Sequence, residues 1–293
     1  MRREPVRQLF ARLTTLLGSE SANLELKWMK QAHVTSTFPT DLSTMLERRL
    51  RGEPLQYILG TTPFGPLELL TRSPTLIPRP ETEDWTMRLA NVISPTSNRP
   101  ISILDICTGS GCIPLLLCHL WPPGSTRAYG VDISPAAIRL SIDNAAKCEI
   151  PAPTHISERF SRNTFLPVLH DIFDADFWTS LHPPFDVVTS NPPYIPHHEY
   201  EQLPASVKDH EDPKALLGDP PGSSNQDGLS FYEHIAFLIG QKGILKDNGV
   251  VALEVGQGQA DAVEKILHKT SGLRKTEIWK DPWDKHRVVV GYA

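Results

Sequence analysis

Beyond residue 100, strand-like and helix-like segments alternate along the chain, and few folds accommodate that order. Short apolar runs are separated by segments with helical spacing of apolar residues, and these runs are "ISILDI", "RAYGVD", "FDVV" and "VVALEV". This alternation predicts an α/β fold with a doubly wound, mostly parallel sheet covered by helices on both faces. The last two strand-like segments, "KTEIWKD" and "HRVVVGY", follow each other too closely for a helical crossover. We therefore expect one of them to run antiparallel.

The composition is that of a globular protein with enough apolar residues for a core, since 40% of the 293 residues are hydrophobic and 22% are charged. No apolar run reaches the length of about 18 residues that a membrane span needs. The four cysteines lack zinc-site spacing, so we expect reduced thiols of an intracellular protein and no metal. Residues 1–75 carry ten Lys/Arg and seven Asp/Glu, whereas the remainder carries 19 and 27. The acidic remainder gives no electrostatic attraction to bare nucleic acid.

The chain is expected to have three parts. Residues 1–52 show helical spacing of apolar residues and predict a small helical domain. Residues 53–75 are rich in Pro and Gly and predict a β-hairpin linker, which leaves residues 76–293 for the α/β domain. The first 17 residues combine four arginines with an apolar stripe. That pattern is compatible with an organelle presequence and with the first helix of the helical domain.

A glycine-rich turn follows the first strand of the α/β part, in "LDICTGSGC". Asp105 ends the strand, and Gly109 and Gly111 let the backbone approach a ligand at a helix N-terminus. Pro114 stands where a dinucleotide-binding loop has its third glycine, which disfavours a pyrophosphate cofactor. Asp132 ends the next strand, where an acid can accept both ribose hydroxyls. Each feature alone also fits an ordinary turn or a strand-end carboxylate, but together they favour S-adenosylmethionine.

The segment "SNPPYI" follows another strand and raises the question of what a double proline does there. The prolines remove two N–H donors and keep Asn191 out of the helical region, so that its side chain is held outward. The side-chain carbonyl of Asn191 and the backbone carbonyl of Pro192 can then accept both hydrogens of a planar –NH2 group, and Tyr194 can stack on it. This arrangement suits methylation of a weakly nucleophilic nitrogen, for which positioning matters most. The alternative is a rigid turn without chemistry.

The order of these segments resembles one family over nearly the whole chain, the HemK/PrmC family of protein-(glutamine-N5) methyltransferases. The resemblance is carried by "GEPLQYILG", "LIPRPETE", "DICTGSG", "VDIS", "SNPPYI", "HEDPKALLG", "DGLSFY", "LEVGQGQ" and "KDPWDKHRVVV". It implies a class I methyltransferase domain with a seven-stranded sheet behind a small helical bundle. It also implies S-adenosylmethionine as cofactor and, as substrate, the glutamine of the Gly-Gly-Gln loop in class I peptide release factors.

The resemblance implies roles for individual residues at the site. The cofactor would be held by Asp105, Cys107, Thr108, Gly109, Ser110, Gly111, Asp132, Asp171, Ile172 and Asn191. The substrate glutamine would be held by Asn191, Pro192, Pro193 and Tyr194, with Arg79 and Glu81 closing over it; Asn191, Pro192 and Tyr194 would be the catalytic residues. Three features depart from the family pattern: Cys107 replaces a usual glycine, and the segments 149–170 and 219–226 look longer.

Two other functions remain open on the sequence. An adenine-N6 methyltransferase acting on DNA or RNA would present the same kind of amino group, but it must extract the base and grip the strand. A non-catalytic factor could keep the cofactor pocket and only bind the release factor or the ribosome. For the main interpretation we expect a monomer with no membrane contact and no nucleic-acid substrate. We expect it in the mitochondrion, or in the cytoplasm if the protein is bacterial.

Overall fold

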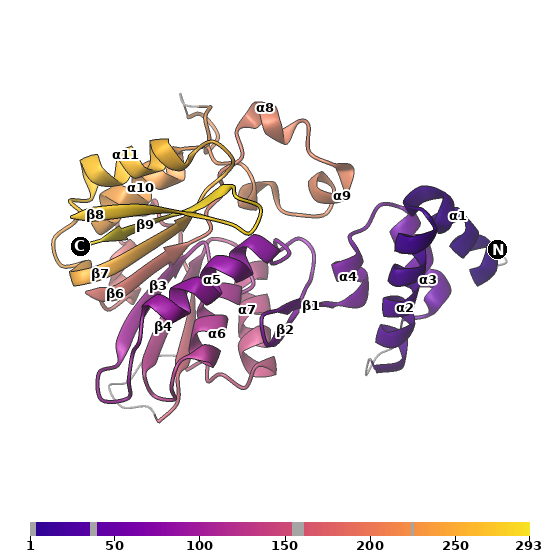
Figure 1. Ribbon diagram of the computed structural model, residues 1–293, viewed down its shortest axis with the longest axis horizontal. Coiled ribbons are helices and arrows are strands. Elements are labelled where there is room, and N and C mark those ends of the chain that lie inside the picture. The colour runs from indigo at the N-terminus through magenta and orange to yellow at the C-terminus, as the bar shows by residue number, and fades with distance from the viewer. Residues whose placement is uncertain (1–3, 36–39, 154–160, 224–225) are drawn as a thin grey trace.

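The computed structural model describes residues 4–35, 40–153, 161–223 and 226–293. A small helical bundle at the N-terminus is joined to a larger α/β part (Figure 1). The bundle consists of α1 (Val6–Leu17), α2 (Ser19–Thr35), α3 (Leu42–Leu50) and α4 (Leu55–Leu59). It has a hydrophobic core of its own, formed by Leu9, Leu13, Ala22, Met29, Met45, Leu46 and Ile58. The segments expected to be helical within residues 1–52 therefore form helices that pack on one another.

A β-hairpin follows the bundle, as expected, but it begins later than the composition indicated. It consists of β1 (Thr61–Phe64) and β2 (Leu67–Leu70), whereas the first part of the expected linker forms the short helix α4. This helix turns the side chain of Ile58 into the bundle core and ends at Gly60, whose φ of 80° is the left-handed conformation common at helix ends. Phe64 is only 1% exposed and packs in the core of the α/β part. The hairpin thus connects the two cores.

The α/β part is built on seven strands in the order β5-β4-β3-β6-β7-β9-β8. All neighbouring pairs are parallel except those that involve β9, which runs antiparallel to both β7 and β8. The expectation of one antiparallel strand at the C-terminus is confirmed. The strands are β3 (Ile101–Ile106), β4 (Thr126–Asp132), β5 (Thr164–Leu169), β6 (Phe185–Ser190), β7 (Leu245–Glu254), β8 (Lys275–Lys280) and β9 (His286–Tyr292).

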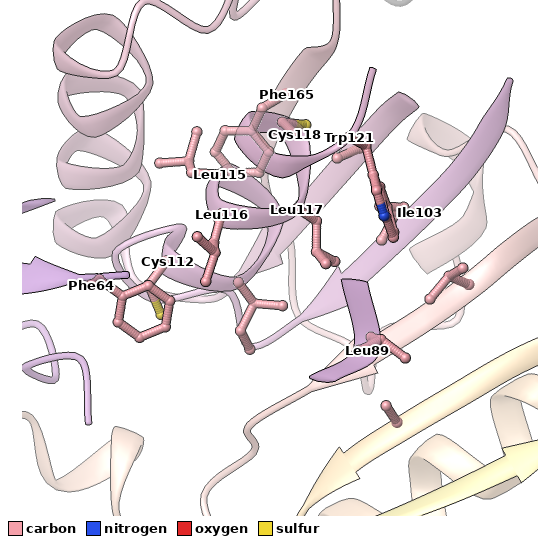
Figure 2. Close-up of a cluster of buried hydrophobic side chains, with 14 of the residues drawn as sticks. Phe64, Leu89, Ile103, Cys112, Leu115, Leu116, Leu117, Cys118, Trp121 and Phe165 are labelled. Atoms are coloured by element: carbon pink, nitrogen blue, oxygen red, sulfur yellow. The ribbon is translucent and has the colours of Figure 1, made fainter. Parts of the chain in front are cut away.

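Helices cover both faces of this sheet, so the doubly wound arrangement predicted from the alternation is confirmed (Figure 1). Residues that alternate along β3 belong to different cores: Ile103 packs on one face and Leu104 on the other. The first face is covered by α5 (Pro80–Val92), α6 (Cys112–Leu120) and α7 (Pro135–Lys147), and the second by α10 (Ser230–Ile239) and α11 (Ala260–Thr270). Figure 2 shows part of the first core, in which side chains of α6 lie near Phe64 and Phe165.

Short elements occupy the segments that had no clear sequence pattern. The expected insertion at 149–170 contains β5, and residues 154–160 lie outside the described residues. The excursion between β6 and α10 holds α8 (His197–Tyr200), α9 (Ala205–Lys208) and the 3-10 turn η2 (Pro213–Ala215), and another 3-10 turn, η1 (Phe177–Ser180), precedes β6. Within the described ranges, none of the helices is both long and apolar enough to cross a membrane.

Candidate active site

Two cavities lie at the C-terminal ends of the parallel strands, where the order of the sheet reverses between β3 and β6. Sheets of this kind bind ligands at that edge. The larger cavity has a volume of about 770 Å³ and the smaller about 170 Å³. Of the predicted site residues, the larger cavity is lined by Cys107, Gly109, Asp132, Asp171, Ile172, Asn191 and Pro193, and the smaller by Arg79, Asn191, Pro192 and Tyr194.

The glycine-rich turn presents only part of its backbone to the larger cavity. A side chain at Gly109 would meet nothing within 4 Å, whereas one at Gly111 would press against Phe165. Thr108 and Ser110 are buried behind the turn and do not line the cavity. Asn144 of α7 fixes the turn from behind, because its Nδ2 donates to the Ser110 carbonyl oxygen at 3.0 Å. Asn144 was not singled out in the sequence.

Cys107 has a φ of 59°, so it adopts a conformation that side chains other than glycine rarely take. It stands at the position where the family resemblance led us to expect glycine, and the backbone keeps the glycine-like angle. Burial raises the pKa of the Cys107 thiol well above its ordinary value, and the nearby carboxylate of Asp132 raises it further. The side chain therefore lines the cavity as a neutral thiol.

Asp132 links the ends of β4 and of the glycine turn. Its Oδ2 accepts a hydrogen bond from the Gly109 backbone N–H at 2.8 Å, and its Oδ1 accepts one from the Ser134 N–H, also at 2.8 Å. Burial raises the pKa of Asp132 above its ordinary value, and these two hydrogen bonds oppose that shift. A carboxylate held in this way still has lone pairs for two hydroxyl groups at the cavity wall.

Asp105 lies beneath the cavity rather than in its wall. It is fully buried, and its Oδ1 accepts a hydrogen bond from the Thr189 hydroxyl at 2.7 Å. Hydrogen bonding by the Thr108 and Thr189 hydroxyls favours the ionised form of Asp105, but burial has the larger effect. Burial raises the pKa of Asp105 to about 7. Asp105 therefore does not line the cavity, and neither do Thr108, Ser110 and Gly111.

The other end of the larger cavity is apolar. Beyond Asp171 and Ile172 it is lined by Phe173 and Phe231, whose ring centroids are 5.3 Å apart. His234 stacks on Phe173 at 4.3 Å, and its Nε2 is 2.7 Å from the Ile172 carbonyl oxygen. The sequence analysis missed both phenylalanines, although Phe173 directly follows two of the predicted residues.

The double-proline segment is fixed by three other segments. Gln259 donates through Nε2 to the Tyr194 carbonyl oxygen at 2.9 Å, and the Ile195 N–H donates to the Leu216 carbonyl oxygen at 2.9 Å. Gly228 passes so close that an added Cβ would lie 2.2 Å from the Tyr194 carbonyl oxygen. The excursion after β6, the turn before α10 and the start of α11 therefore all hold this segment in place.

Arg79 lines the smaller cavity and forms an ion pair with Glu211, with 2.6 Å between Nη2 and Oε2. The Glu211 side chain is 1% exposed, so the pair fixes the excursion after β6 to the segment that precedes α5. Burial raises the pKa of Glu211, and the Arg79 guanidinium opposes that shift. Glu81 lies in the first turn of α5 and lines neither cavity.

The residues that line the larger cavity fit S-adenosylmethionine. The open backbone at Gly109 leaves room beside the turn, and Asp132 offers acceptors for ribose hydroxyls next to it. The apolar end at Ile172 and Phe173 suits a flat aromatic base. Among the residues that line it are no lysine or arginine side chains other than Lys214, which fits a cofactor without a pyrophosphate.

Comparison with known proteins identifies the family. A methyltransferase domain family model matches residues 79–192. The release factor glutamine methyltransferase of Thermodesulfovibrio yellowstonii is 33% identical, over 90% of this chain and 85% of that protein. The enzyme of the same name from Caulobacter vibrioides is 34% identical, over 85% of this chain and 77% of that one. The chain belongs to the release factor glutamine methyltransferase family. It is an enzyme that uses S-adenosylmethionine, as the sequence predicted.

A human relative, the MTRF1L release factor glutamine methyltransferase, is 34% identical over 77% of this chain and 62% of its own length. Among solved structures, a release-factor-specific protein-(glutamine-N5) methyltransferase from Alicyclobacillus acidocaldarius is 24% identical over 74% of this chain and 93% of that one, with a TM-score of 0.40. Bacterial and human members of the family thus both align with most of this chain.

Proposed function

We propose that this protein methylates the side-chain amide nitrogen (N5) of the glutamine in the Gly-Gly-Gln loop of a class I peptide release factor. One observation carries the proposal: Asn191 lines both cavities. A methyl donor in the larger cavity and an acceptor amide in the smaller one would meet at this residue. The names of the relatives support the same substrate.

In this proposal, Asp132 and the Gly109 backbone hold the ribose and methionine side of the cofactor, and Ile172 and Phe173 enclose its base. When bound, S-adenosylmethionine supplies an electrophilic methyl group. Asp105 joins the ends of β3 and β6 through its hydrogen bond with Thr189 and does not line the cavity. The buried thiol of Cys107 stays protonated and adds no charge beside a cationic sulfonium.

The smaller cavity holds the acceptor. Its apolar walls at Leu203, Val207 and Leu216 suit the aliphatic part of a glutamine side chain. The Asn191 side-chain carbonyl and the Pro192 backbone carbonyl each accept one amide hydrogen, which turns the nitrogen lone pair toward the larger cavity. The nitrogen would gain the methyl group and lose one of its two hydrogens as a proton to solvent, and breaking of the bond between the methyl group and sulfur would leave S-adenosylhomocysteine as the second product. Burial raises the pKa of Tyr194 above its ordinary value, so this side chain packs against the amide as a neutral phenol.

We propose the same three parts as before: residues 1–52 dock the release factor, 53–75 link, and 76–293 carry out the transfer. Exposed apolar side chains on the bundle support a docking role. Leu24 and Trp28 lie one turn apart on α2 and are 44% and 41% exposed. The Arg79–Glu211 ion pair would then close the smaller cavity near the bundle. The enzyme is proposed to act as a monomer, with no nucleic-acid substrate.

We also propose that the protein acts in the mitochondrion, in translation termination. The arginine-rich start of the chain and the human relative support this location. Arg12 pairs with Glu4 at 2.7 Å, and Leu9 and Leu13 pack in the bundle core, so the same stretch also has a structural role. Fractionation of cells that express the protein with Arg2, Arg3 and Arg7 replaced by glutamine tests the proposal. The wild type should be found in mitochondria and the variant should be lost from them. Wild-type protein outside mitochondria would contradict the location, and a variant that remains in mitochondria would contradict the role of these arginines.

The test of function uses labelled S-adenosylmethionine and three acceptors. These are a release factor, the same factor with the Gly-Gly-Gln glutamine replaced by alanine, and adenine-rich DNA. We expect label only on the intact release factor, and loss of that label with Asn191→Ala. Label on the DNA would replace our proposal by the base-modifying alternative. Cofactor binding without transfer to any acceptor would leave a non-catalytic binding factor.

A further inference from the structure

The side chain of Asn191 is connected to a buried carboxylate on another strand. Asn191 donates through Nδ2 to the Thr82 hydroxyl oxygen at 3.3 Å, and the Thr82 hydroxyl donates to Glu254 Oε2 at 2.6 Å. Thr82 is in α5 and Glu254 ends β7, and both are only 1% exposed. The three residues form a chain of hydrogen bonds that runs from the protein interior to the junction of the two cavities.

The direction of this chain follows from the chemistry of its members. Glu254 Oε2 also accepts the indole N–H of Trp85 at 2.8 Å, and an indole nitrogen can only donate. The Thr82 hydroxyl has a single hydrogen, and it is used in the hydrogen bond to Glu254 Oε2. The Thr82 oxygen can therefore only accept from the third partner, which must be the –NH2 end of the Asn191 amide.

This direction determines what Asn191 offers to a ligand. If its amide were rotated by half a turn, its Oδ1 would face the Thr82 oxygen, and two acceptors would meet without a hydrogen between them. The observed orientation leaves Oδ1 for the cavities, which is the acceptor that a substrate –NH2 group needs. Tyr232 keeps the carboxylate in place, since its hydroxyl donates to the Glu254 backbone carbonyl at 2.8 Å.

We propose that Thr82 and Glu254 are positioning residues that fix the orientation of the Asn191 amide, and thereby make the site an acceptor for an –NH2 substrate. Neither residue lines a cavity, so they act through Asn191 and not on the substrate. The proposal rests on the proposed function of amide methylation. It gives a common role to three segments that are far apart in the sequence, "RPETE", "SNPPY" and "LEVGQ".

Thr82→Val removes the hydroxyl and keeps the shape of the side chain. We expect kcat for release-factor methylation to fall about tenfold, which is the effect of losing one orienting hydrogen bond. The dissociation constant for S-adenosylmethionine should change less than about twofold. Thr82→Ser should restore most of the activity. Thr86→Val is the matched control, because Thr86 is equally buried one turn along α5 and bonds only to the Thr82 backbone carbonyl.

A double-mutant cycle separates positioning from packing. Glu254→Met removes the acceptor of the Thr82 hydroxyl and should also lower kcat. The Thr82→Val/Glu254→Met double variant should be no slower than the worse single variant, because both substitutions interrupt the same chain of hydrogen bonds. Equal activity of Thr82→Val and wild type would overturn the proposal. So would equal losses with Thr82→Val and Thr82→Ser, or losses that multiply in the double variant.

A second measurement does not depend on the reaction. In protein labelled with ¹⁵N at asparagine side chains, the Asn191 amide signal is assigned with Asn191→Ala. We expect that signal to move in Thr82→Val and to return in Thr82→Ser, whereas Thr86→Val leaves it in place. A signal that does not respond to Thr82→Val overturns the proposal even if wild type proves to methylate another substrate. If the wild type does not methylate the release factor, the proposed function is contradicted. The amide signal would still test the orientation of the Asn191 side chain.

Discussion

Replacing Asp105 by asparagine removes a charge from the interior with almost no change of side-chain shape. Asp105 is fully buried, and its Oδ1 accepts a hydrogen bond from the Thr189 hydroxyl. Burial raises its pKa from 3.8 to about 7 in the folded protein. In the unfolded chain the carboxyl group ionises near its ordinary pKa of about 4. Ionisation therefore favours the unfolded state over the range between these two values.

The expected magnitude follows from the two pKa values. Part of the stability of the wild type depends on Asp105 being neutral. This part is fully present below a pH of about 4 and is lost as the pH rises through about 7. The complete loss corresponds to roughly 4 kcal/mol. Between pH 5 and pH 8, Asp105→Asn should gain roughly 2 to 3 kcal/mol of unfolding free energy relative to wild type.

Urea denaturation of both proteins, without cofactor, at pH 5, 6, 7 and 8 measures this difference. Asp105→Ala is the control, because it also removes the charge but leaves the Thr189 hydroxyl without an acceptor. It should be less stable than Asp105→Asn at every pH and show the same slope relative to wild type. A difference between Asp105→Asn and wild type that does not vary with pH would refute the account of this buried carboxyl group.

Three further substitutions test the site. Gly228→Ala should abolish most methyl transfer, since its Cβ would lie 2.2 Å from the Tyr194 carbonyl oxygen. Gly272→Ala is the control, because Gly272 is also at positive φ but has open space around it and lines neither cavity; it should retain activity, and equal activities of the two variants would contradict this. Cys107→Gly should be about 1 kcal/mol more stable to urea than Cys107→Ala, because the φ of 59° suits glycine. A less stable Cys107→Gly would show that the backbone at residue 107 is not strained. Asp132→Asn should weaken S-adenosylmethionine binding about tenfold in calorimetry, through weaker hydrogen bonds to ribose hydroxyls; unchanged affinity would remove Asp132 from the ribose site.

Much of the fold could be predicted because the signals are local. Ser134 and Pro135 mark the start of α7, and the Ser134 hydroxyl does accept from the Ala137 N–H at 3.4 Å. The alternation of apolar runs predicts the parallel sheet. In contrast, β5 was missed because Pro167 interrupts its pattern, and this proline is tolerated because β5 is an edge strand. Helices as short as α4 and α9 span too few residues for a period to be visible.

The site was predictable only in part, for a related reason. Asn191 and Asp132 stand at strand ends with their own sequence signals. The connection between Thr82 and Glu254 joins residues 172 positions apart, and nothing local marks it. Likewise, Asp105 looks like a ligand-facing acid in the sequence, but in the structure its side chain is fully buried and does not line the cavity. Burial and long-range pairing are properties of the folded chain.

The central claim is that the methyl group is transferred to the amide nitrogen of one glutamine. Tandem mass spectrometry of a release factor, digested after incubation with the enzyme and S-adenosylmethionine, measures this directly. We predict one added methyl group on the glutamine of the Gly-Gly-Gln peptide with wild type, and none with Asn191→Ala. A methyl group on any other residue, or the same modification with Asn191→Ala, would contradict the account.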